Sequence, residues 1–137
     1  MAQYMLDTNM CIYLMKHQPP EVAQRFAQCR VGDVVMSAIT YAELAYGVSV
    51  SAHPEQEAAN LAALVEDIPV WPFDKAAATA YGPIRFATRD SKKDHLDKLI
   101  AAHAVAVGFV LVTNNLKDFA KYPGLQAENW LTPVANH

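Results

Sequence analysis

Short apolar runs alternate with longer helical patterns along most of this chain. The runs of strand length are residues 3–6, 33–37 and 109–113, and each is followed by a segment in which apolar residues recur at helical spacing. This alternation is typical of a parallel sheet with helices on its faces. We therefore predict an α/β fold.

Six segments have the residue types and spacing of helices: 8–16, 20–29, 39–50, 54–67, 94–108 and a short one at 114–122. Pro20 is suited to the first position of its helix, and in the fifth helix Asp94 is placed to cap and Gly108 to end it.

Prolines and glycines limit the remaining segments. Two prolines in 68–73 allow only a short strand at an edge of the sheet, and 125–130 is expected to add a last edge strand. Residues 74–90 are predicted to be helical at both ends, with an irregularity at Gly82-Pro83.

The composition fits one globular domain spanning residues 1–137, with 53% hydrophobic and 18% charged residues. No apolar run reaches the roughly 18–20 residues that span a bilayer, and no basic-then-apolar leader opens the chain, so we expect neither membrane insertion nor secretion. Cys11 and Cys29 lack metal-ligand spacing and are expected to be reduced thiols of a cytoplasmic protein.

The net charge of −3 gives no general attraction to nucleic acid, so RNA binding would need a local basic surface or bound cations. Basic residues cluster before and inside the 94–108 helix. They form either an ordinary solvated face, interleaved with acids, or a rim that contacts RNA phosphates. The residues are Arg85, Arg89, Lys92, Lys93 and Lys98.

Polar side chains stand where the predicted strands end, which is where open parallel sheets bind ligands. Asp7 follows the first strand, Ser37 ends the second, and Thr113 begins a Thr-Asn-Asn triplet after the 109–113 strand. Glu43 and Asp97 lie early in neighbouring helices, and Asp118 follows the triplet by one helical turn.

Each acid also has a purely structural interpretation. Asp7 can cap the helix that follows it. Glu43 can reach back to Thr40 in a capping box, unless Ser37 is the cap and leaves Glu43 in the second turn. Asp97 can be a first-turn acid favoured by the helix dipole.

Together the acids indicate a metal site. Two carboxylates roughly 5 Å apart, at an effective dielectric constant near 20, repel each other by about 3 kcal/mol. A divalent cation turns that repulsion into coordination. Oxygen ligands without Cys or clustered His favour Mg²⁺ or Mn²⁺ over Zn²⁺.

Five ordered segments carry a family resemblance that runs from residue 4 to residue 130. They resemble the PIN domain of VapC-type toxins, the ribonucleases of bacterial toxin–antitoxin pairs. The resemblance implies a three-layer α/β/α sandwich with metal-binding carboxylates at Asp7, Glu43 and Asp97. The segments are MLDTNMCIYL, SAITYAELAYGV, LDKLIAAHA, LVTNNLKDF and YPGLQAENW.

This sequence differs from the family pattern at the fourth acidic position. Many PIN domains have an acid two residues after the strand-end Thr, where this chain has Asn115, so Asn115 and Asp118 are both candidates for catalysis. Asp94 is either a helix cap or an extra ligand. Thr8, Asn9, Ser37 and Thr113 are expected to support the carboxylates or contact phosphate.

The resemblance also implies an activity and partners. A Mg²⁺- or Mn²⁺-dependent endoribonuclease would hydrolyse RNA, possible targets including initiator tRNA in its anticodon stem-loop, and so inhibit translation. A VapB-type antitoxin would neutralise it. Tyr13, Met15, Tyr41 and Tyr46 either form a groove for this partner or belong to the core. The family implies a homodimer, a larger hetero-oligomer with the antitoxin, and operator DNA bound only through the antitoxin.

Two other functions are compatible with parts of this sequence. A PIN fold can act as a non-catalytic binding module. A haloacid-dehalogenase-like phosphatase also begins with an Asp after its first strand, but it needs a second Asp where this chain has Asn9.

Overall fold

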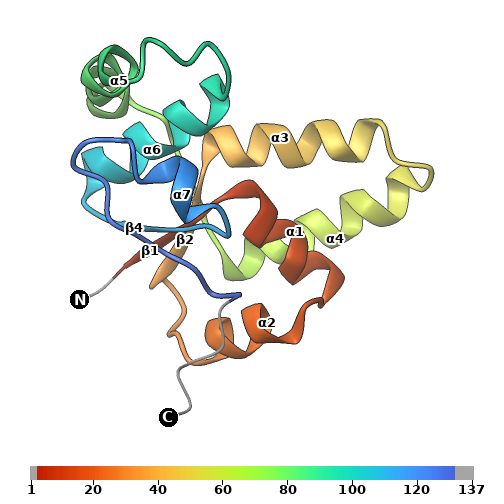
Figure 1. The fold of residues 1–137 in the computed structure, drawn as a ribbon. Helices are drawn as coiled ribbons and strands as arrows, with labels where there is room; N and C mark the ends of the chain where they lie inside the picture. The colour runs from red at the N-terminus through yellow and green to blue at the C-terminus, as the bar shows by residue number, and fades with distance from the viewer. Residues whose placement is uncertain (1–2, 132–137) are drawn as a thin grey trace.

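The computed structural model describes residues 3–131, and its centre is one five-stranded sheet (Figure 1). The strand order is β3-β2-β1-β4-β5, and every neighbouring pair is parallel. The predicted parallel sheet is therefore confirmed. The strands are β1 (Tyr4–Leu6), β2 (Val34–Ser37), β3 (Val70–Trp71), β4 (Val110–Val112) and β5 (Ala127–Glu128).

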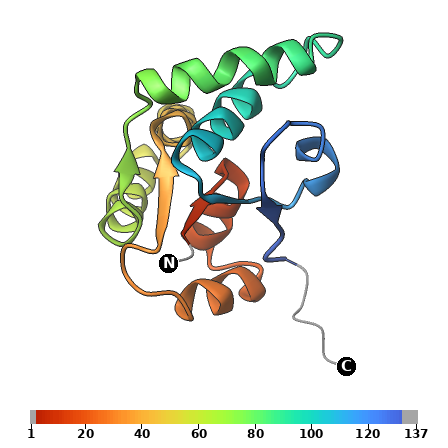
Figure 2. The ribbon, with the colours of Figure 1, turned by 90° about the vertical axis from the view of Figure 1, so that its left-hand side faces the viewer.

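Helices cover both faces of this sheet, as the three-layer prediction requires (Figures 1 and 2). The helices are α1 (Thr8–Lys16), α2 (Pro20–Ala27), α3 (Ala38–Ser49), α4 (Pro54–Asp67), α5 (Lys75–Ala87), α6 (His95–Val107) and α7 (Leu116–Phe119). Helices α1, α2 and α4 share a core with one face of the sheet, and α5 and α6 share a core with the other. Helix α3 contacts α1, α4 and α6.

The two cores follow from the alternation of side chains along each strand. Leu6, Met36 and Val112 are paired neighbours in the sheet and belong to the core beneath α1 and α4. Met5 and Leu111, one residue earlier in their strands, belong to the core beneath α6. Both faces are apolar because both are covered, which is the usual condition of a parallel sheet.

Most helix boundaries agree with the sequence prediction to within two residues, and local chemistry explains several of them. Pro20 and Pro54 lie at the first position of α2 and α4, and the side chain of Asp74 caps α5. Gly108 ends α6 in the left-handed conformation, with φ 74°. The short strands β3 and β5 lie at the sheet edges, as predicted.

Two local predictions are wrong. The expected irregularity at Gly82-Pro83 is absent, because α5 is one helix with Pro83 inside it. Pro83 and Thr79, whose carbonyl loses its usual partner, are both exposed, so water can satisfy that carbonyl. Asp94 occupies the cap position of α6 but has φ 64°, and its side chain makes no capping hydrogen bond.

Cys11 is buried, Cys29 is partly exposed, and both are free thiols, as predicted. Within residues 3–131, no helix combines the length and the apolar character that a bilayer crossing requires.

Candidate active site

Asp7 lies at the carboxyl end of β1 and is almost completely buried. Its carboxylate accepts a hydrogen bond of 2.9 Å from the backbone N–H of Met10, so it caps α1. Burial raises the pKa of this carboxyl, whereas hydrogen bonds from Met10 and from the Thr113 hydroxyl act in the opposite direction. The capping interpretation is therefore correct. It does not exclude a functional role, because a carboxylate has a second oxygen free to act.

Glu43 lies in the second turn of α3 because Ser37, and not Thr40, caps this helix. The Ser37 hydroxyl accepts a hydrogen bond of 3.0 Å from the N–H of Ile39. The carboxylate of Glu43 accepts a hydrogen bond from the hydroxyl of Thr8, the first residue of α1. The capping-box interpretation of Glu43 is wrong, and Thr8 supports this carboxylate as predicted.

Asp97 shows that the acids converge. It lies in the first turn of α6, and its pKa is raised to about 6, first by burial and then by the negative charges of neighbouring carboxylates. Those carboxylates belong to Asp94, Asp7, Glu43 and Asp118. Acids from four different parts of the chain therefore act on one side chain.

In this structure the acidic side chains are not positioned to coordinate a metal ion together. Within the described residues, no three His, Cys, Asp or Glu side chains are arranged to hold an ion as they stand. The chemistry of the donors nevertheless fits Mg²⁺ or Mn²⁺, because only carboxylates converge on Asp97. Asp97 and Glu43 are only partly buried, so an ion from solvent can reach them.

Asn115 and Asp118 act as a pair at the edge of this pocket. The Asn115 side-chain amide donates a hydrogen bond of 2.7 Å to a carboxylate oxygen of Asp118. The backbone N–H of Asn115 is in turn bonded to the Thr113 hydroxyl at 3.0 Å. Asn115 therefore orients Asp118, whose charge is the smallest of the four that raise the pKa of Asp97.

Ser37 and His103 form a buried pair beneath the acids. The Ser37 hydroxyl lies 2.7 Å from Nδ1 of His103, and the imidazole ring meets Phe73 edge-on. Burial lowers the pKa of His103, and the nearby charge of Asp74 opposes this only in part. His103 is thus a neutral supporting group between α6 and the end of β2. Asn9, by contrast, is exposed.

Four of the five residues predicted to form a basic rim are exposed, and one is buried. Arg85, Arg89, Lys92 and Lys93 are exposed, but Lys98 is only 1% exposed and cannot contact RNA. Its ammonium group donates hydrogen bonds to the carbonyls of Thr88 and Ser91, at 3.2 and 2.7 Å. The prediction for Lys98 is wrong because its stem packs into the α5–α6 contact.

Tyr122 is a residue that the sequence did not single out. Its hydroxyl is buried and has no hydrogen-bond partner within the described part of the chain. Burial raises its pKa, and so do the charges of Asp97, Asp94 and Asp118, which places this phenol beside the acids. No local sequence signal marks it, because a Tyr after a short helix is ordinary core.

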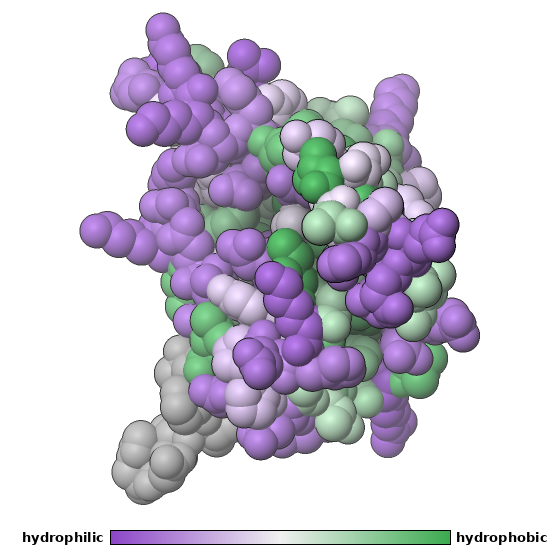
Figure 3. Space-filling model, turned by 90° about the vertical axis from the view of Figure 1, so that its right-hand side faces the viewer, coloured by the Kyte–Doolittle hydropathy of each residue, from purple (hydrophilic) through white to green (hydrophobic). Residues whose placement is uncertain are grey.

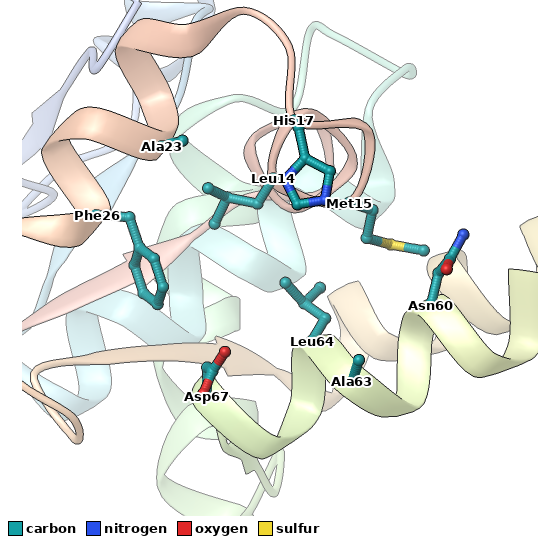
Figure 4. A pocket seen from close by; sticks show the side chains of 9 residues that line it. All are labelled: Leu14, Met15, His17, Ala23, Phe26, Asn60, Ala63, Leu64 and Asp67. Atoms are coloured by element: carbon teal, nitrogen blue, oxygen red, sulfur yellow. The ribbon is translucent and has the colours of Figure 1, made fainter.

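Two adjoining pockets lie along α1 and α4, and one of them includes Glu43. One, of about 240 Å³, lies between α1, α2 and α4, where Leu14, Phe26 and Leu64 face one another (Figure 4). The other, of about 400 Å³, is lined by α1, α3 and α4 and includes Glu43. Met15 and Asn60 line both, so the two pockets adjoin and extend from α2 to Glu43, and the lining is more polar at the Glu43 end.

Only Met15 of the four residues predicted to form a partner groove lines these pockets. The Tyr13 hydroxyl is instead bonded to Asn114 at 2.9 Å. Tyr41 and Tyr46 are 38% and 70% exposed, so they are not core. The face toward which the α3–α4 hairpin points is mainly hydrophilic, with small separate hydrophobic patches (Figure 3).

Comparisons with known proteins agree with this arrangement. The family described as "PIN domain" matches residues 4–125. A "tRNA(fMet)-specific endonuclease VapC" from Shigella flexneri is 39% identical, over 95% of this chain and 99% of the relative. "Ribonuclease VapC2" from Haemophilus influenzae is 38% identical, over 96% of this chain and 100% of the relative.

Solved structures show the same similarity. The DNA-bound VapBC structure from Salmonella typhimurium contains a chain with a TM-score of 0.87 and 36% identity, and the match covers 95% of this chain and 99% of that chain. VapBC2 from Rickettsia felis, bound to a promoter DNA fragment, gives a TM-score of 0.83 and 34% identity, covering 93% and 98%.

Proposed function

This chain belongs to the PIN-domain family and, within it, to the VapC ribonucleases, and from that premise we propose that its acidic pocket cleaves RNA with a bound Mg²⁺ or Mn²⁺ ion. The chain is an endoribonuclease toxin, a reading that the relatives' names support over a phosphatase or a non-catalytic module. We take its substrate to be initiator tRNA, cut in the anticodon stem-loop, because the Shigella relative is named for tRNA(fMet).

The observation that carries the proposal is the convergence of acids on Asp97, whose pKa is raised first by burial and then by the charges of Asp94 and of more distant acids. Asp7, Glu43 and Asp118 come from the end of β1, from α3 and from α7, and all three charges act on Asp97. A fold without a use for these acids gains nothing from such repulsion. A cation that binds them removes it.

In this proposal Asp7, Glu43 and Asp97 hold the ion. When bound, it lowers the pKa of a water molecule and stabilises negative charge on the phosphate. The chain's own groups prepare the site: Met10 N–H fixes one oxygen of Asp7, and the Thr8 hydroxyl orients Glu43. Hydrolysis by water leaves a 5′-phosphate and a 3′-hydroxyl.

The flanking residues have supporting roles. Asn115 orients Asp118, which is partly exposed and would help to hold a second ion that arrives with the substrate. Ser37 and Thr113 close the buried side, since their hydroxyls bond His103 and Asn115 N–H. These hydroxyls satisfy polar groups without adding charge.

An RNA cleavage assay tests this function. Wild-type protein with Mg²⁺ should cut tRNA(fMet), and EDTA should stop it. Asp97→Asn and Glu43→Gln should each lower the rate by at least about 100-fold, because each removes one ligand charge. The matched control is Glu66→Gln, which neutralises an exposed carboxylate on α4. Undiminished cleavage by Asp97→Asn, or in EDTA, would contradict the proposed site.

The relationship to the VapC ribonucleases also indicates a protein partner. Solved relatives are VapBC complexes, some bound to DNA, and we propose a VapB-type antitoxin as the partner of this chain and its link to operator DNA. The pocket between α1, α2 and α4 suits an apolar antitoxin segment, because Leu14, Phe26 and Leu64 line it. Its continuation to Glu43 would let the same segment reach the acids.

A further inference from the structure

The end of α5 presents an aromatic ring to solvent. Phe86 is 67% exposed although it is one of the larger apolar side chains in the protein. The Arg89 guanidinium lies 4.4 Å from the centre of the ring, and one of its N–H groups donates a 2.9 Å hydrogen bond to the Phe86 carbonyl. One face of the ring is thus supported by a cation, and much of the rest is open.

Basic residues are concentrated near this ring in the sequence, with one exposed acid, Asp90, among them. Arg85, Arg89, Lys92 and Lys93 account for four of the chain's 11 Lys and Arg residues and fall within residues 85–93. All four are exposed, and none forms an ion pair within residues 3–131, where the ion pairs are Arg25–Glu128 and Lys121–Asp94. In a chain of net charge −3, this is a local basic surface.

The buried Lys98 fixes that surface relative to the acids. Its ammonium group bonds the carbonyls of Thr88 and Ser91, which lie at the start of the α5–α6 connection. Asp97 is the preceding residue of α6. Figure 2 shows α5 and α6 as a hairpin with this connection at one end of the molecule. The ring, the basic residues and Asp97 therefore belong to the same end of one hairpin.

We propose that Phe86, supported by Arg89, is a stacking platform for an unpaired base of the RNA substrate, with Arg85, Lys92 and Lys93 contacting the flanking phosphates. The inference rests on the proposed function and names a contact that selects unpaired RNA. Proteins recognise single-stranded RNA by stacking bases on aromatic rings and Arg planes, and cations hold the backbone. Phe and Arg are also enriched at protein interfaces, but the core of such an interface is depleted in charged residues, and here four cations without an ion-pair partner in residues 3–131 accompany one ring, which favours RNA.

Binding of a synthetic RNA hairpin tests the platform. The hairpin carries 2-aminopurine in its loop, and a duplex of the same length has no unpaired base. EDTA is present, and a gel confirms that the RNA stays intact. Phe86→Ala should weaken hairpin binding by about 5- to 100-fold and abolish the quenching of 2-aminopurine, and it should leave duplex binding unchanged. Phe86→Tyr, which keeps the ring, should bind within about twofold of wild type.

Two controls separate stacking from other effects. Val31→Ala removes another apolar side chain, which is 87% exposed and precedes β2, at the end of the sheet opposite the acids. It should change nothing. Lys92→Glu with Lys93→Glu should weaken hairpin and duplex binding alike and reduce the salt dependence, because phosphate contacts do not distinguish the two RNAs.

Several results would overturn the platform. Wild-type hairpin affinity of Phe86→Ala would do so, and so would equal losses for Phe86→Ala and Phe86→Tyr, or an equal loss on the duplex. A change of oligomeric state in Phe86→Ala, measured by light scattering with unchanged RNA affinity, would make this surface a contact between copies. Ring-dependent hairpin binding without any Mg²⁺-dependent cleavage would refute the nuclease and leave the platform standing.

Discussion

Replacing Asp97 by Asn should stabilise the metal-free protein, although it removes a residue of the active site. Asp97 has a pKa of about 6 against an ordinary value of 3.8, which corresponds to about 3 kcal/mol of unfavourable free energy when the group is charged in the folded state. Asp97 is partly exposed, and solvent screening lowers this to about 1–2 kcal/mol. Asn keeps the size of the side chain and removes the charge.

Thermal unfolding in EDTA at pH 7.5 measures this gain. A stabilisation of about 1–2 kcal/mol should raise the Tm by roughly 3–8 °C in a protein of this size. Glu66→Gln, on the exposed side of α4, should shift the Tm by less than about 2 °C. The advantage of Asp97→Asn should shrink as the pH falls through 6 toward 3.8, because the folded wild type then takes up a proton before the unfolded chain does.

Added Mg²⁺ or Mn²⁺ should reverse the order of stability. An ion at about 100 times its Kd stabilises the wild-type fold by about 2.7 kcal/mol, and Asp97→Asn should lose most of that gain. If Asp97→Asn is no more stable than wild type in EDTA, burial and the neighbouring carboxylates do not disfavour the charged form of Asp97, and the raised pKa from which we argue is wrong.

Two further predictions concern the buried groups around the pocket. Lys98→Met should lower the free energy of unfolding, measured in urea, by about 1–3 kcal/mol, because two carbonyls lose their hydrogen-bond donor. It should also speed amide exchange in residues 88–94. An unchanged urea midpoint would show that water replaces the ammonium group. Because burial lowers the pKa of His103, the wild type should lose stability relative to His103→Gln as the pH falls below about 6.5, since the unfolded chain then binds a proton that the fold excludes; parallel pH profiles would contradict this.

The sequence predicted the fold because the chain's periodicity and its breakers point in the same direction. Met5 and Leu6 are both apolar since each faces a different helical layer, and this produces the continuous apolar runs of a covered parallel sheet. Pro69 and Pro72 flank β3 and limit it to an edge position. Pro83 misled the prediction, because an exposed helix face tolerates a missing hydrogen bond that a buried face does not.

Lys98 and Asp94 show what the sequence pattern left open. Charge along a helix says little about which charged residue is buried. Ala101 and Ala102 follow Lys98 by three and four residues and are both 0% exposed, so Lys98 lies on the same buried helix face, which packs against α5. The small alanine side chains leave space there for the aliphatic part of Lys98. That spacing was visible in the sequence. The left-handed backbone of Asp94 was not, because Asp at such a position normally indicates an extended cap.

The convergence of the acids is a consequence of strand register and helix direction. Leu6 pairs with Met36 on one side and with Val112 on the other, so the residues after β1, β2 and β4 emerge at one edge of the sheet. Asp7 and Glu43 follow β1 and β2 and reach that edge directly. Asp97 lies in α6, the helix before β4. The last turn of α6 leads through Gly108 to the start of β4, so the first turn of α6, with Asp97, lies near the other end of that strand, where Asp7 is. A sequence shows which acids border strands and helices. Only the register shows that they lie at one end of the sheet, close enough for Asp7 and Glu43 to add to the effect of burial on the pKa of Asp97.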